Sequence, residues 1–175
     1  MSAQTMSVEV REMSLAETHL VIDYFRSSTP EYLEMLGVDP TRLPDRDTWS
    51  ERFKQLYLMP LERRWGLYVV WLLDNEPVGF SSCDKIAFGK QAHMHLHVTR
   101  PDQRQCGIGT QCVRQSVEIY FSKLKLSRLL CEPNAFNVGP NRTLQKAGFR
   151  YLKTHTTVPG PLNYHQAVTR WVIER

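Results

Sequence analysis

The chain has 175 residues, of which 42% are hydrophobic and 23% are charged, and this composition predicts one soluble globular domain over residues 1–175. Its net charge of +4 comes from scattered basic residues and not from a stripe, so we expect no nucleic-acid partner. It has no apolar run long enough to cross a bilayer and its first ten residues lack signal-peptide features, so we expect no membrane partner and a cytoplasmic location.

The N-terminal third predicts one strand followed by helices. Residues 8–13 alternate between apolar and polar side chains, as a strand does. Ser14 and Glu17 have the spacing of a capping box, in which the two residues satisfy free backbone donors, and they predict that a helix starts there. A second helix is expected to start at Pro30, and apolar residues at helical spacing predict a third over residues 49–59.

The middle of the chain predicts three antiparallel strands. Residues 67–73 and 78–83 flank a short polar segment and are expected to form a hairpin. Residues 92–98 read AHMHLHV and alternate strictly, which indicates a third strand of the same sheet.

The C-terminal part begins with the strongest predicted helix, an apolar stripe over residues 108–124. Because a buried strand is expected over residues 126–132, the strand at 92–98, the helix and this strand form a βαβ crossover. The remaining predicted elements are a helix over 138–147 and strands over 149–158 and 167–174. Together the elements predict an α+β fold: a mixed, mostly antiparallel sheet of about six to seven strands with helices on both faces.

The segment DQRQCGIGTQ, residues 102–111, joins the strand at 92–98 to the long helix. The first backbone N–H groups of a helix lack partners and carry partial positive charge. Gly107 and Gly109 leave room for a phosphate there, and Arg104 and Gln105 add donors, so the turn can form a pyrophosphate site. The alternative is a glycine-containing turn before a core helix. A Rossmann dinucleotide site is disfavoured because the third glycine is missing.

Two motifs in this order resemble the GNAT superfamily of acyl-CoA-dependent N-acyltransferases. VTRPDQRQCGIG is similar to the phosphate-binding signature Arg/Gln-x-x-Gly-x-Gly/Ala, and NVGPNRTLQKAGF, residues 137–149, is similar to the later Asn-to-Gly-Phe motif. The likeness is best over residues 66–175, and CEPNAFN, residues 131–137, most resembles aminoglycoside and hydroxamate-siderophore acetyltransferases. The resemblance implies a GNAT-like fold and acetyl transfer from acetyl-CoA, without a metal, to a primary amine of a small molecule by direct attack in a ternary complex.

The resemblance also implies the residues that hold the cofactor. Val98 and Thr99 would offer backbone groups to the pantetheine arm, residues 104–110 would hold the pyrophosphate, and Asn137 would contact the arm. The implied cofactor residues are Val98, Thr99, Arg104, Gln105, Cys106, Gly107, Ile108, Gly109, Thr110, Asn137 and Asn141.

One position departs from the family pattern. Many relatives have a Tyr that protonates the departing thiolate where this chain has Leu144, which cannot donate a proton. Tyr164, Asn141 or water would then be the acid, or the thiolate leaves without strong acid help.

Three residues are candidates for the base that takes the amine proton. His95 and His97 lie, with His93, on one face of the predicted strand, and imidazole titrates near neutral pH. Glu132 ends the predicted strand 126–132, where a carboxylate can relay a proton and attract an ammonium. Each candidate has a structural alternative: an ordinary hydrogen-bonded imidazole, or a carboxylate that caps a loop.

Other functions stay open at this point. A non-catalytic acyl-CoA sensor would keep the phosphate site and lose the proton chemistry, and an acetyltransferase could act on a protein amine instead. A homodimer is also left open.

Overall fold

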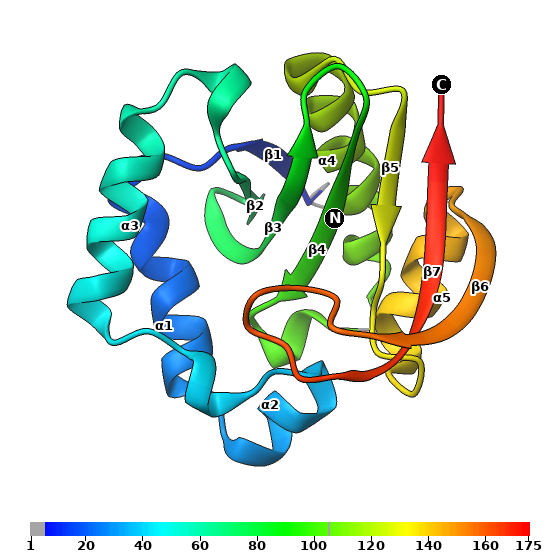
Figure 1. Ribbon diagram of the computed structural model, residues 1–175, viewed down its shortest axis with the longest axis horizontal. Coiled ribbons are helices and arrows are strands. Elements are labelled where there is room, and N and C mark those ends of the chain that lie inside the picture. The colour runs from blue at the N-terminus through cyan, green and yellow to red at the C-terminus, as the bar shows by residue number, and fades with distance from the viewer. Residues whose placement is uncertain (1–5, 105) are drawn as a thin grey trace, which may run out of the picture.

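The computed structural model describes residues 6–104 and 106–175, and these form a seven-stranded sheet with helices on both faces (Figure 1). The strands are β1 Val8–Glu12, β2 Leu67–Leu73, β3 Glu76–Ala87, β4 Gln91–Val98, β5 Arg128–Cys131, β6 Arg150–Thr157 and β7 Gln166–Glu174. The helices are α1 His19–Ser27, α2 Pro30–Leu36, α3 Arg46–Leu58, α4 Ile108–Leu124 and α5 Val138–Ala147. Short 3-10 helices cover Leu15–Thr18, Pro40–Arg42, Leu61–Arg63 and Pro101–Gln103.

The strands lie in the order β1-β2-β3-β4-β5-β7-β6. β4 and β5 are parallel and are connected through α4, whereas the other neighbouring strands are antiparallel. The hairpin between β2 and β3 turns at Asp74 and Asn75, which both have positive φ. Such a two-residue turn matches the twist of the two strands.

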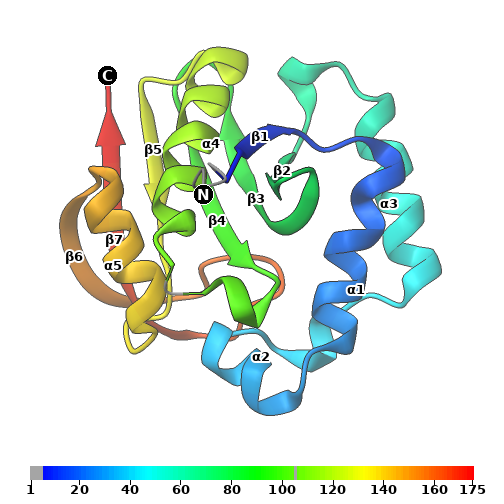
Figure 2. The ribbon, with the colours of Figure 1, turned by 180° about the vertical axis from the view of Figure 1, so that it is seen from behind.

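Two hydrophobic cores cover the two faces of the sheet. On one face α4 and α5 pack against the strands around Trp71 and Tyr120, both fully buried. On the other face α1, α2 and α3 pack around Phe80. The two groups of helices lie apart in both views of the molecule (Figures 1 and 2).

The sheet divides between β4 and β5. These strands pair from Gln91 with Arg128 to Met94 with Cys131, and no β4–β5 pair of the described residues lies beyond that point. The segment after β5 remains hydrogen-bonded to β7. Thr169 N donates to Pro133 O at 3.1 Å, and Ala135 N donates to Ala167 O at 3.0 Å. The second half of β4, from residue 95, therefore borders a gap in the sheet.

The predicted fold is confirmed, with differences at element ends. The Ser14–Glu17 capping box is present, but the turn it opens is a 3-10 helix that leads into α1. β3 extends to Ala87 because Ala87 still pairs with Gln91 of β4. β5 ends at Cys131, so Glu132 follows the strand and does not end it.

Each helix within the described ranges is too short or too polar to cross a membrane.

Candidate functional site

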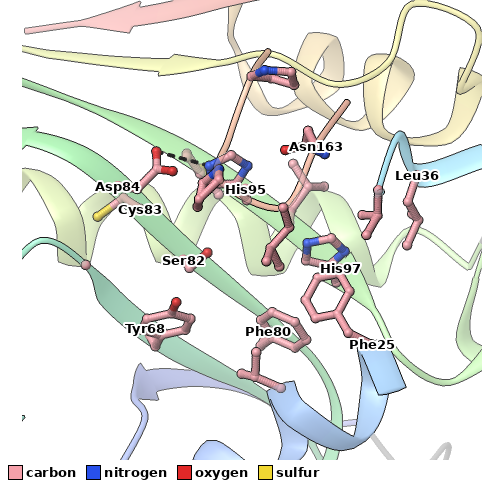
Figure 3. Close-up of a pocket in the computed structure, with 18 of the residues that line it drawn as sticks. Phe25, Leu36, Tyr68, Phe80, Ser82, Cys83, Asp84, His95, His97 and Asn163 are labelled. Atoms are coloured by element: carbon pink, nitrogen blue, oxygen red, sulfur yellow. Dashed lines mark ion pairs between the residues drawn. The ribbon is translucent and has the colours of Figure 1, made fainter. Parts of the chain in front are cut away.

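A cavity of about 270 Å³ opens where β4 and β5 separate (Figure 3). Residues of β2, β3, β4, α1, α2 and α3 line it, together with the segment after β5 and the loop between β6 and β7. His95, His97 and Glu132, the three residues predicted as bases, all border it.

His95 forms a pair with Asp84 of the neighbouring strand β3. Its Nε2 atom lies 3.1 Å from Oδ1 of Asp84, and neither atom has a hydrogen bond to another of the described residues. Burial lowers the pKa of His95, but the negative charge of Asp84 beside it outweighs this effect, so the pKa is raised above its ordinary value. Burial opposes ionisation of Asp84, yet His95 holds the pKa of that carboxyl below its ordinary value. The pair has the arrangement of an imidazole supported by a carboxylate.

His97 has a different environment, two residues further along β4. Its ring lies 4.9 to 5.2 Å, between centroids, from the rings of Tyr24, Phe25 and Phe80. Burial, with a smaller effect of His95, lowers its pKa to about 3, so the imidazole is neutral at physiological pH. His97 belongs mainly to the aromatic layer beneath α1.

Glu132 is the centre of an ion-pair network. Its Oε1 accepts a hydrogen bond from Arg170 Nε at 2.5 Å and lies 3.3 Å from His155 Nε2, while Oε2 lies 3.6 Å from His93 Nδ1. Burial raises the pKa of this carboxyl, but the nearby His93 and the hydrogen bond and charge of Arg170 outweigh it and hold the pKa at about 2. A carboxylate with so low a pKa is a weak base, and both of its oxygens already face cationic or imidazole partners.

The predicted phosphate turn lies at the start of α4. Gly107 has a φ of +78°, which disfavours any side chain there. A Cβ atom at Gly109 would meet its nearest neighbour, Thr143, at 3.7 Å, so packing alone does not require glycine at that position. Within the described residues, no side chain caps the helix, so its first N–H groups have no side-chain partner there.

The other residues of this turn differ in exposure. Ile108 is buried in the core beneath α4, whereas Cys106 is exposed. Thr110 is half-buried in the first turn of the helix. Gln105 lies outside the described residues.

Arg104 contacts α2 and the end of β4. Its guanidinium lies 4.7 Å from the centre of the Tyr32 ring, and its Nε donates to Val98 O at 3.3 Å. Arg104 lines a second cavity, of about 470 Å³, between α1, α2 and the end of β4. Thr99 borders the same cavity, and its N–H donates to Val78 O at 2.9 Å.

The motif at residues 137–149, which contains α5, has one residue that borders the main cavity and one that holds the neighbouring backbone in place. Asn137 lines the cavity. Asn141 donates to the backbone oxygens of Asn134 and Asn137 and accepts from Trp171 Nε1 at 2.9 Å, so it fixes the segment after β5. Leu144 is fully buried in the core.

Tyr164, one of the candidate acids, does not line the main cavity within the described residues. Its hydroxyl donates to Glu34 O at 3.0 Å.

Sequence reasoning missed Asp84 and the loop between β6 and β7. Asp84 gave a weak signal, because β3 has only one other acid, Glu76 at its first residue, and pairs with a strand that carries three alternating histidines. The loop is tied to the end of α2 by Asn163 Nδ2, which donates to Gly37 O at 2.9 Å, and it lies against His95 at Gly160. It therefore closes one wall of the cavity.

Comparisons with known proteins agree with this architecture. The model of the Acetyltransferase (GNAT) family matches residues 24–149. Aminoglycoside N(6')-acetyltransferase type 1 of Klebsiella pneumoniae is 29% identical over 116 residues, covering 59% of this chain and 57% of that protein. The Kanamycin resistance protein of Rhizobium radiobacter is 36% identical over 69 residues, covering 39% of this chain and 63% of that protein. The chain thus spans less than two thirds of the length of these curated relatives.

One solved structure shows the shared fold. It is an aminoglycoside acetyltransferase in complex with coenzyme A and kanamycin, with a TM-score of 0.70 and 19% identity. The match covers 97% of this chain and 95% of that one.

Proposed function

The chain belongs to the Acetyltransferase (GNAT) family, and on that premise we propose that residues 1–175 form one N-acetyltransferase domain that moves an acetyl group from acetyl-CoA to a primary amine of a small molecule. Aminoglycosides, which the names of the two relatives indicate, are one candidate class of acceptor. The observation that carries the proposal is that the His95–Asp84 pair faces the cavity at the residue where the sheet divides.

The described residues fit acetyl-CoA. The start of α4, which no side chain of the described residues caps, would offer N–H groups to the pyrophosphate, and Gly109 would leave the approach to them open. The edge of β4 from residue 95 to Val98, together with Asn137, borders the gap that would take the pantetheine arm. When bound there, acetyl-CoA supplies an activated acyl carbon as a thioester.

The proton chemistry is assigned to His95. An amine attacks only in its neutral form, and a neutral imidazole can take the proton that the nitrogen loses as the new N–C bond forms and the C–S bond breaks. Asp84 stabilises the imidazolium that results. Because Leu144 and Tyr164 offer no proton to the cavity, water relays the proton of the His95 imidazolium to the departing thiolate, which leaves as the free thiol. Glu132 then acts as a positioning residue that anchors β7 to the segment after β5.

Direct attack on acetyl-CoA is favoured over transfer through an acetylated cysteine. Cys83 and Cys131 border the cavity, but burial raises the pKa of each thiol well above its ordinary value. The thiolate is the nucleophilic form, so these cysteines are inert at neutral pH.

The test is amine-dependent release of free coenzyme A thiol, measured with wild type and with His95→Ala. We expect release that requires an amine, a kcat lowered roughly 10²- to 10⁴-fold in the variant, and an unchanged affinity for acetyl-CoA by calorimetry. Acetyl-CoA binding without release for any amine would identify a sensor and overturn the proposal.

A further inference from the structure

The walls of the main cavity are largely apolar where they lie away from the gap in the sheet. Its aromatic lining consists of Phe25, Trp49, Phe53, Trp65, Tyr68 and Phe80. These residues come from α1, α3, β2, β3 and the segment before β2, so several elements contribute to one aromatic surface. Figure 3 shows Phe25, Tyr68 and Phe80 on the same side of the cavity as His97.

The charged residues of the cavity leave one carboxylate for an acceptor. Both oxygens of Glu132 already contact Arg170 or a histidine. Asp84 has His95 as its partner, and its second oxygen, Oδ2, has no hydrogen bond to the described residues. One carboxylate can hold one ammonium group before that group gives up its proton.

Two arginines lie on the same wall as α3. Arg42 has its Nε 3.5 Å from Oδ2 of Asp39, and Arg52 has no carboxylate partner among the described residues. Both guanidinium groups are exposed at the edge of the cavity, and their positive charge would disfavour a second or third ammonium group of an acceptor. The positive charges of the two arginines therefore select against acceptors that carry several positive charges.

From this arrangement we propose that the acceptor is a primary amine with a single positive charge and an apolar body that packs on the aromatic wall. The proposal rests on the proposed function and names its substrate class. The proposed acceptor differs from the aminoglycosides that the names of the relatives indicate, because aminoglycosides carry several ammonium groups. The cavity volume of about 270 Å³ also favours a small acceptor. Pockets for drug-sized ligands have volumes of roughly 300 to 1,000 Å³, and this cavity must also admit the thioester end of acetyl-CoA.

The first experiment compares 2-phenylethylamine with kanamycin as acceptors, by thiol release and by calorimetric binding to the protein saturated with coenzyme A. We expect kcat/KM and affinity to be about 100-fold higher for 2-phenylethylamine, or about 2.7 kcal/mol. Equal or better values for kanamycin would overturn the proposal, and so would binding of neither amine. Binding of 2-phenylethylamine without thiol release would leave the acceptor class supported and contradict the proposed function instead.

The second experiment reverses one charge of the wall. In Arg52→Glu we expect the affinity for kanamycin to rise about tenfold while that for 2-phenylethylamine changes less than twofold, because the variant exchanges a repelling group for an attracting one. Lys54→Glu is the matched control, since it makes the same charge change on the same helix at an exposed residue that does not border the cavity. Equal effects of the two variants would show that net charge acts from a distance, and would overturn the role of the wall.

Discussion

Asp84 sets the protonation state of His95, and this gives a prediction for the pH dependence of the rate. His95 is active as a base when it is neutral, so the rate rises with pH through the pKa of His95. Asp84 raises that pKa, with a smaller contribution from Glu132, while burial and Lys85 lower it. In Asp84→Asn we therefore expect the midpoint of the kcat/KM profile to move to lower pH. Glu62→Gln, an exposed carboxylate outside the cavity, is the control. An unmoved midpoint would show that His95 is not the titrating base.

Glu132 gives a prediction for stability. Its pKa is about 2 in the folded protein against an ordinary value of 4.5, so its stabilisation is present above pH 4.5 and is lost as the pH falls toward 2. Glu132→Gln should lower the free energy of unfolding by about 3 kcal/mol at pH 7, because Arg170 loses its buried partner, and by less at pH 3. Urea denaturation at both pH values measures this.

The control for Glu132 is Glu174→Gln, which removes the exposed pair with Arg150 and should change the free energy of unfolding by no more than about 0.5 kcal/mol.

The sequence predicted Glu132 as a base, and this stays a prediction. A loss of turnover as large as that of His95→Ala, without loss of stability, would make Glu132 the base and overturn its assignment as a positioning residue.

At the scale of elements, the start of α4 is the feature that decides cofactor affinity. In Gly109→Val the new side chain fills the approach to the N–H groups, while its Cβ has ordinary contact distances to Thr143 and Val98, so the fold should persist. We expect the affinity for acetyl-CoA in calorimetry to fall about 10- to 100-fold, as when one or two charge-assisted hydrogen bonds are lost.

Gly139→Val is the matched control for this variant, because Gly139 is the second residue of α5 as Gly109 is of α4. Both variants place the same branched side chain in the first turn of a helix. Equal loss of affinity in the two would point to helix destabilisation and would contradict a phosphate site at α4.

The elements themselves could be predicted from local signals. The α5 helix was predicted over its observed bounds, because Gly148 adopts the left-handed conformation that ends it. β4 was predicted from its alternation, which places Met94 in one core and His97 against the other. The ends of β3 and β5 were less predictable. The end of β3 is set by the irregular hairpin in which Ala87 pairs with Gln91, and the end of β5 by its pairing with the distant strand β7.

At the scale of the whole molecule, the site could be predicted only in part. Spacing placed His95 and His97 on one face of a strand, but the His95–Asp84 pair depends on the register between β3 and β4, which a single sequence does not reveal. The division of the sheet likewise depends on β7 keeping the chain after β5, as the contact between Thr169 and Pro133 shows.

The cavity combines segments that are far apart in sequence. α3, β4 and the loop near Asn163 each supply part of its wall, so its apolar character appears only in the folded chain. The turn before α4 could be predicted because a glycine motif is local. The position of Arg104 over the Tyr32 ring could not be predicted, because Tyr32 lies in α2.

The central claim is that an amine in this cavity takes the acetyl group directly from acetyl-CoA. The most direct measurement follows acetyl-CoA labelled in its acetyl group, with 2-phenylethylamine as acceptor, by mass spectrometry of the small molecules and of the intact protein. The account predicts that the label appears on the amine nitrogen and at no stage on the protein. Label on a cysteine of the protein before it reaches the amine, or no label on the amine at all, would contradict the account.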